Sequence, residues 1–209
     1  MALDKYARRF LELTGASAKN RAGEPTLAEM RAGLDGLAAF AGPARGPQVE
    51  IRDAILPGTM IPVRIYSPPA PSAEILPGLV FFHGGGWLSG GLASHDAICR
   101  ALAREGACRV LAVDYRLAPE HRFPAGIEDC RAALAIIFAQ APRFGLDAGR
   151  IGVAGDSAGG NLAVVVCHWP EKAVRKSPCR RCFARSWMRS AIPNRGARSA
   201  AIIFSKSAR

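Results

Sequence analysis

The sequence predicts an α/β protein with a mostly parallel sheet and flanking helices. Three short apolar runs, each followed by a helix-like segment, cover Leu79–Phe82, Val110–Val113 and Ile151–Ala154. Strands of a parallel sheet that is buried on both faces are continuous apolar runs of this kind, separated by helices. Val49–Ile55 and Met60–Tyr66 form an alternating pair joined through a Pro-Gly turn, which predicts antiparallel strands at one edge. At 209 residues, one domain is expected.

Helices are predicted from apolar spacing and capping signals. Residues 3–13 carry apolar side chains at helical intervals. Thr26 and Glu29 form a T-x-x-E capping box, which begins a second helix that runs to about Phe40. Four prolines mark a surface loop: Pro68, Pro69, Pro71 and Pro77. Further helices are predicted over residues 94–105, Ile127–Gln140 and Asn161–Cys167.

The net charge of +11 is concentrated at one end of the sequence. Up to Cys167 there are 17 Lys+Arg and 16 Asp+Glu, whereas residues 168–209 hold 11 basic residues and one acid, Glu171. The body of the protein is therefore close to neutral, and its charge does not predict a nucleic-acid-binding domain.

Cysteine usage and the N-terminus bear on the cellular compartment. Four cysteines have apolar neighbours, as reduced buried thiols usually do: Cys99, Cys108, Cys130 and Cys167. The sequence contains no secretory signal pattern and no apolar run long enough to span a membrane. We expect a cytoplasmic protein with free thiols and no transmembrane segment.

The segment Gly155-Asp156-Ser157-Ala158-Gly159 fits the pattern G-x-S-x-G and lies between an apolar strand and a helix. A sharp strand-to-helix turn exposes the hydroxyl group of its central serine, and the glycines on either side leave room for the turn. The helix N-terminus also favours the negative charge that develops when a serine attacks a carbonyl group. The pattern predicts a nucleophile elbow centred on Ser157.

A glycine loop, His83-Gly84-Gly85-Gly86-Trp87, follows the strand that precedes the elbow by about seventy residues. Backbone N–H groups in such a loop can converge on one oxygen and form an oxyanion hole. Neither glycine segment matches G-x-G-x-x-G with a suitably spaced acid, and no G-K-[ST] occurs, so nucleotide binding is not predicted.

Together these motifs resemble the hormone-sensitive-lipase-like, or GDXG, family of α/β-hydrolase esterases. The resemblance spans residues 1–167 and is carried by the glycine loop, the elbow with Gly160-Asn161, and the segments Asp114–His121 and Phe123-Pro124-Ala125. It implies an α/β-hydrolase core over residues 46–167, with the helices of residues 1–45 forming part of a cap over the pocket.

The family resemblance also implies roles for individual residues. Ser157 would be the nucleophile, and the backbone amides of Gly85, Gly86 and Ala158 would form the oxyanion hole. Substrates would be small carboxylic esters, with neither cofactor nor metal.

Other polar residues near these motifs are not expected to be catalytic. The Asp114–Glu120 segment is structural in the resembling family, so an Asp–Arg pair that braces a loop, involving Asp114 and Arg116, is expected. Asp156 adjoins Ser157, but neighbouring side chains on such a turn point apart, so it is not expected to orient a base. His83 and His121 are expected to hydrogen-bond the backbone. His95, at a predicted helix start, is expected to be a surface or capping residue.

The serine lacks recognisable partners in the sequence. An α/β-hydrolase supplies an acid and then a histidine after the serine, but here only His168 and Glu171 follow Ser157, in the reverse order. About eleven residues of helix would place His168 about 16 Å from the serine. We therefore predict that the catalytic triad of serine, acid and histidine is incomplete and that the chain is nearly inactive.

Residues 168–209 do not resemble a hydrolase, and we expect an irregular, poorly ordered basic tail with no clear period before Ile202–Phe204. One hypothesis is that the reading frame shifts near Cys167–Trp169; a coding sequence without a hydrolase-like continuation in another frame would contradict it. Cys179-Arg180-Arg181-Cys182 is C-x-x-C, but neither further zinc ligands nor a thioredoxin-like setting accompany it.

Three functions remain open from the sequence. The first is an esterase that acts through Ser157, as the family resemblance implies. The second is a noncatalytic hydrolase remnant, in which the Ile151–Ala154 strand would leave an apolar sheet edge unpaired and prone to aggregation. The third is weak, nonspecific anion or nucleic-acid binding through the basic tail; specific nucleic-acid binding is not expected.

Overall fold

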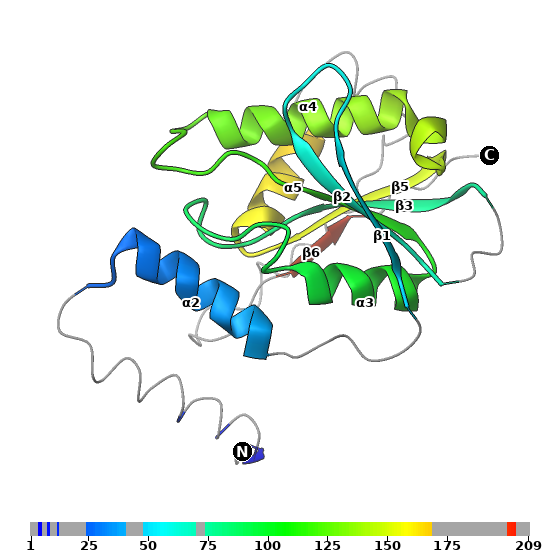
Figure 1. Ribbon diagram of the computed structural model, residues 1–209. Helices are drawn as coiled ribbons and strands as arrows, with labels where there is room; N and C mark the ends of the chain where they lie inside the picture. The colour runs from blue at the N-terminus through cyan, green and yellow to red at the C-terminus, as the bar shows by residue number, and fades with distance from the viewer. Residues whose placement is uncertain are drawn as a thin grey trace.

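The computed structural model describes residues 4, 5, 8, 12, 24–40, 48–69, 74–168 and 200–203. The predicted first helix and most of the predicted tail lie largely outside these residues. The described part forms a six-stranded mixed sheet in the order β1-β2-β4-β3-β5-β6, with helices on both faces (Figure 1). The strands are β1 Glu50–Ile55, β2 Pro62–Ser67, β3 Leu76–Phe82, β4 Arg109–Val113, β5 Leu146–Asp156 and β6 Ala200–Ile203. The α/β class with flanking helices agrees with the sequence prediction, and the strands paired in parallel are those at the centre of the sheet.

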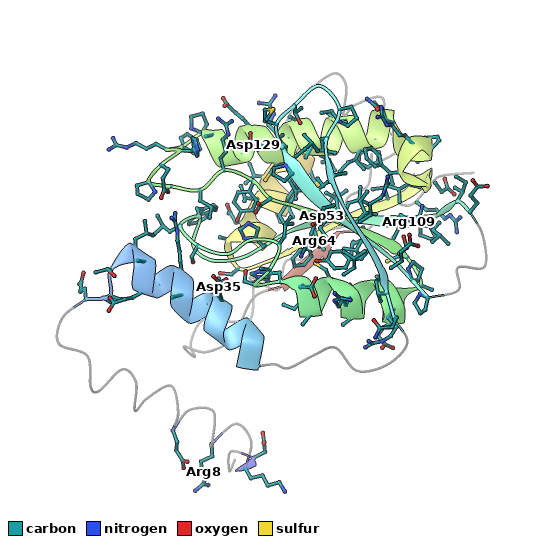
Figure 2. The ribbon with its side chains drawn as sticks, in the orientation of Figure 1. Arg8, Asp35, Asp53, Arg64, Arg109 and Asp129 are labelled. Atoms are coloured by element: carbon teal, nitrogen blue, oxygen red, sulfur yellow. The ribbon has the colours of Figure 1, made fainter. Side chains whose placement is uncertain are left out.

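The predicted N-terminal hairpin is confirmed. β1 and β2 are antiparallel, and β2 is also antiparallel to β4, so the hairpin forms one side of the sheet. Arg64 of β2 donates two hydrogen bonds to Asp53 of β1, of 2.6 and 2.8 Å, and Figure 2 labels this pair. The hydrogen bonds from Arg64 hold the pKa of Asp53 below its usual value.

The parallel centre of the sheet consists of β4, β3 and β5. β3 begins at Leu76 and includes Pro77, so the prediction that Pro77 belongs to a surface loop was wrong. The pairing of β3 with β5 shifts register between Leu76 and Gly78. This irregularity accommodates a residue that has no backbone N–H to donate to the ladder.

Alternate residues of the strands pack into two cores. Val80 and Phe82 of β3 belong to the core beneath α4 (Ala125–Ala139) and α5 (Ala158–His168). Leu79 and Phe81 face the core that contains residues of α3 (Asp96–Gly106). The helices therefore cover opposite faces of the sheet, as Figure 1 shows. Strand residues of both cores are continuous and apolar, which explains why the sequence pattern located the strands.

The predicted capping box begins α2 (Leu27–Phe40). The backbone N–H of Thr26 donates to Glu29 Oε2 at 2.7 Å, and the Glu29 amide donates to Thr26 Oγ1 at 3.3 Å. α2 lies beside the loop that follows β3 rather than on the sheet (Figure 1). This position agrees with a cap helix, although the division of the chain into cap, core and tail stays a prediction.

The far edge of β5 is paired, contrary to the expectation of an open apolar edge. β6 runs antiparallel to β5, with Val153 opposite Ile203 and Asp156 opposite Ala200. β6 overlaps the apolar Ile202–Phe204 segment, where the sequence first regained a strand-like pattern. Pairing satisfies backbone groups that an edge strand would leave exposed. Within the described residues, no helix has the length and hydropathy that crossing a bilayer requires.

Candidate active site

Ser157 lies at the junction between β5 and α5, at the carboxyl end of the parallel strands. Its φ is +50°, a left-handed conformation that is costly for a residue with a Cβ. Its side chain is exposed, whereas Ala158 is buried at the start of α5. The local geometry is therefore the strained, exposed turn that the G-x-S-x-G pattern predicts.

The two glycines of the elbow allow α5 to approach β3 closely. A Cβ added to Gly159 would overlap the carbonyl oxygen of Phe82, and one added to Gly155 would overlap the backbone of Gly159. These glycines are required by contact between backbones. Their presence fixes the start of α5 directly beside the end of β3.

The glycine loop leaves β3 next to the elbow, because Phe82 of β3 is paired with Gly155 of β5. Gly85 and Gly86 have φ values of +122° and +65°, which favour glycine. Ser89 closes the loop, since its backbone N–H and its hydroxyl group both donate to the Gly85 carbonyl, at 3.0 and 2.8 Å. The residues predicted as oxyanion donors and the predicted nucleophile therefore lie on adjacent turns.

Asp156 links these two turns. Its Oδ1 atom accepts the Gly84 N–H at 2.8 Å and lies 3.1 Å from Nε2 of His95. Burial on its own raises the pKa of Asp156, but its interactions with His95 and the Gly84 amide outweigh burial, and the pKa lies below its ordinary value. The carboxylate is ionised at neutral pH.

His95 was predicted to be a surface or capping residue; it is buried, so the surface alternative was wrong, whereas the capping alternative agrees with its position. It occupies the N-cap position of α3 but makes no side-chain capping hydrogen bond. Its Nδ1 lies 2.9 Å from Ser94 Oγ, and its Nε2 faces Asp156. With both ring nitrogens engaged, His95 has none left to accept a proton from Ser157.

His83, the first residue of the glycine loop after β3, is also buried. Its ring stacks on Tyr115 with 4.3 Å between centroids, and its Nδ1 lies 2.8 Å from the Gly84 carbonyl oxygen. Burial lowers the pKa of His83 to about 4, so the ring is neutral at pH 7. The expectation that His83 bonds to the backbone agrees with this geometry.

The expected Asp–Arg brace exists, but with a different acid. Arg116 donates to Asp129 of α4 from its backbone N–H, Nε and Nη2, at 3.0, 2.8 and 2.7 Å. Figure 2 labels Asp129 on this helix. Asp114 instead lies 4.0 Å from His83 Nε2, and burial raises its pKa. Sequence proximity suggested Asp114 as the partner, whereas the helix packing supplies Asp129.

The remaining two histidines, His121 and His168, also make no hydrogen bond with Ser157 among the described residues. His121 is exposed in the loop before α4. His168 ends α5, the helix that starts beside Ser157, and its Nδ1 is 2.8 Å from the Val164 carbonyl oxygen. Within the described residues, no histidine hydrogen-bonds to Ser157, and no group of three or more potential ligands is suited to a metal ion. Glu171 lies outside the described residues.

Arg31 of α2 connects the predicted cap to the glycine loop, a contact that the sequence analysis missed. Its Nε donates to the Leu88 carbonyl at 2.8 Å, and its Nη1 and Nη2 each donate to Glu120 at 2.8 Å. No local sequence signal pairs these residues, because they come from three separate segments.

Comparison with known proteins supports the same grouping. A family model described as alpha/beta hydrolase fold matches residues 79–184, about half of the chain and beyond Cys167. The carboxylic ester hydrolase LipN of Mycobacterium tuberculosis is 50% identical over 127 residues, which are 58% of this chain and 33% of that protein. An arylesterase of Saccharolobus solfataricus is 38% identical over 164 residues, 78% of this chain and 53% of that protein.

Solved structures give a consistent result. An ester-hydrolase from the metagenome of Lake Arreo has a TM-score of 0.70 and 40% identity, over 79% of this chain and 54% of that one. An esterase of Pyrobaculum calidifontis has a TM-score of 0.67 and 36% identity, over 80% and 53%. The chain thus spans between about a third and a half of the relatives it matches. With the elbow, the glycine loop and these likenesses in agreement, the chain belongs to the hormone-sensitive-lipase-like family of α/β-hydrolases.

Proposed function

We propose that this protein performs carboxylic-ester chemistry through Ser157. The observation that carries the proposal is the exposed Ser157 at φ +50°, on a turn adjacent to a glycine loop with positive φ values. The relatives named above are esterases, and the Lake Arreo structure is complexed with a phosphonate derivative. Small carboxylic esters are the proposed substrates.

In the proposed reaction, the Ser157 oxygen attacks the ester carbonyl carbon. The backbone amides of Gly85, Gly86 and Ala158 donate to the oxygen that becomes negative, and the N-terminus of α5 adds a favourable dipole. The alcohol leaves with the serine proton, an acyl-serine forms, and water then releases the carboxylic acid and restores the serine.

Removal of the proton from the Ser157 hydroxyl group is the step that we expect to be slow. His83 and His95 are bonded elsewhere, and His168 lies at the opposite end of α5. A serine hydrolase without its base and acid loses about 10⁴- to 10⁶-fold in turnover. We therefore propose slow, Ser157-dependent hydrolysis by the chain described here.

Two measurements test the proposal. The parent chain and Ser157→Ala are compared for hydrolysis of p-nitrophenyl butyrate, and both are incubated with a p-nitrophenyl phosphonate before peptide mass spectrometry. We expect slow hydrolysis that the substitution abolishes. We also expect the peptide that contains Ser157 to gain the mass of the phosphonyl group. Equal hydrolysis by both chains, with no adduct on Ser157, would show a noncatalytic member of the family.

Ser94 provides a useful internal comparison, because Ser94, His95 and Asp156 also form a Ser–His–Asp series. The Ser94 hydroxyl group is held by the Gly91 N–H at 3.0 Å and the Gly91 carbonyl at 3.1 Å. Ser94 is bound within its own turn, so the adduct is expected on Ser157 and not on Ser94. An adduct on Ser94 would contradict the assignment of the nucleophile.

A further inference from the structure

The bridge between the elbow and the glycine loop depends on a single oxygen atom. Asp156 Oδ1 accepts from the Gly84 N–H at 2.8 Å and also faces His95 Nε2 at 3.1 Å. Asp156 immediately precedes the nucleophile, and Gly84 immediately precedes the first proposed oxyanion donor. A Cβ added to Gly84 would overlap the Asp156 carboxylate, so the two turns are in close contact.

The imidazole ring of His95 is held on several sides. Ser94 Oγ lies 2.9 Å from Nδ1, and the rings of His83 and Phe81 have centroids 5.5 and 6.1 Å away. The side chain is 6% exposed. Because an ionised carboxylate only accepts hydrogen bonds, the proton on this side of the ring is on Nε2. His95 therefore donates to Asp156 from a position that packing fixes.

Three glycines in succession do not fix their own backbone conformation, since glycine loses more conformational freedom on ordering than any other residue. Oxyanion donors need positions accurate to about 0.5 Å. The Ser89 contacts close the loop upon itself, but they do not fix it relative to Ser157. The contacts of Asp156 with Gly84 and His95 hold the loop relative to Ser157.

We propose that His95 is a positioning residue, which orients Asp156 so that its carboxylate holds the glycine loop in register with Ser157. The proposal rests on the proposed esterase function for its catalytic consequence, but not for its structural one. Among the described residues, His95 makes no hydrogen bond with Ser157. It acts from the start of α3, through Asp156 and Gly84, on the amides of Gly85 and Gly86.

The test uses two substitutions of His95 that differ in reach. In His95→Gln, the side-chain amide extends to about the position of Nε2 and can still donate to Asp156. In His95→Asn, the shorter amide can reach Ser94 but not Asp156. Cys99→Ala is the matched control, because Cys99 is a fully buried residue one turn further along α3 and its thiol belongs to neither of the contacts that link His95, Asp156 and Gly84.

Amide hydrogen exchange of a peptide covering residues 83–89 is the first measurement. We expect exchange at least about ten-fold faster in His95→Asn, and within about three-fold of the parent in His95→Gln and Cys99→Ala. A purely stabilising role would instead make His95→Asn and Cys99→Ala similar in this peptide once matched for stability, and that outcome overturns the proposal. If His95→Asn does not fold, Asp156→Ala, which removes the shared acceptor, carries the same expectation and the same criterion.

The rate of Ser157 phosphonylation is the second measurement. We expect it to fall about ten-fold in His95→Asn and to be restored in His95→Gln. If the parent is not phosphonylated while loop exchange follows the expected order, the esterase function fails and the positioning role stands. If the parent is phosphonylated but neither exchange nor rate distinguishes Asn from Gln, the esterase function stands and the positioning role fails.

Discussion

Two buried histidines, His83 in the glycine loop and His95 at the start of α3, have different surroundings. His95 has a partner at each ring nitrogen, one of them the carboxylate of Asp156. His83 bonds only through Nδ1, and within the described residues its Nε2 has no hydrogen-bond partner. The ring centroids are 5.5 Å apart, so the difference arises over a very short distance.

This difference assigns different tasks to the two rings. On the His95 side, the loop is attached to the elbow through hydrogen bonds that involve an ionised group. On the His83 side, it is held by aromatic stacking and by Tyr115, whose hydroxyl group donates to the His83 carbonyl at 2.7 Å. The His83 ring remains neutral because burial disfavours its charged form, and the Asp114 carboxylate, 4.0 Å from Nε2, is too far away for a hydrogen bond.

The largest expected effect is a loss of folding stability at low pH, which we attribute to His83. Burial lowers the pKa of His83 to about 4, whereas an unfolded histidine has a pKa of about 6.5. Between these values the unfolded chain binds a proton that the folded chain does not, so stability falls as the pH decreases. The loss should reach about 3 kcal/mol at pH 4.

Urea unfolding of the parent and His83→Phe from pH 7 to pH 4 measures this loss. The phenyl ring can stack on Tyr115 but cannot titrate, so the component between pH 6.5 and 4 should be absent from the variant. Acid-sensitive carboxylates such as Asp53 contribute equally to both chains and cancel in the difference. Parallel curves would mean that His83 is protonated as readily in the folded chain as in the unfolded one.

A smaller effect is expected at Tyr115. Tyr115→Phe keeps the stacked ring but removes the hydrogen bond to the buried His83 carbonyl, at a cost of about 1–2 kcal/mol. Urea unfolding at pH 7 measures the change, with Tyr66→Phe as control, because its hydroxyl group donates to Asp96 on the opposite face. An unchanged unfolding free energy for Tyr115→Phe would show that stacking alone holds this side.

The sequence predicted the parts of this site that depend on local signals. The elbow was located because a strand, a turn and a helix occur in sequence, and each has its own pattern. The glycine loop was located in the same way, at the end of an apolar strand. The same locality explains the errors: His95 looked like the start of a surface helix, and Asp114 looked like the partner of Arg116.

The contacts that were missed join segments distant in the chain. Asp156 meets His95 because β5 ends, and α3 begins, at the edge where the glycine loop turns. Arg116 meets Asp129 because α4 packs over that edge. The pairing of β6 with β5 also depends on the assembled sheet. Nothing in the composition of any one segment specifies these partners.

The smallest expected effect concerns the exposed side of the glycine loop, where Arg31 binds. Arg31 and Glu120 hold α2 by charge-assisted hydrogen bonds that are more exposed to solvent than the Asp156–His95 bridge. The hydrogen bond from Arg31 lowers the pKa of Glu120 to about 2, so the pair is ionised at neutral pH. Arg31→Ala should therefore loosen α2 only slightly, with roughly two- to five-fold faster amide exchange over residues 26–36.

Salt distinguishes the exposed contact from the buried one. Screening at about 1 M salt, where the Debye length is about 3 Å, should bring the parent close to Arg31→Ala in α2 exchange. Exchange over residues 83–89 should change less in salt, because the Asp156–His95 bridge is less exposed than the Arg31–Glu120 pair. Glu120→Ala is the matched control and should reproduce the Arg31→Ala result except for the contact with the Leu88 carbonyl. If Arg31→Ala instead loosened the glycine loop as much as His95→Asn, the Arg31 contacts and the Asp156–His95 bridge would act as one unit, and the contrast between them would fail.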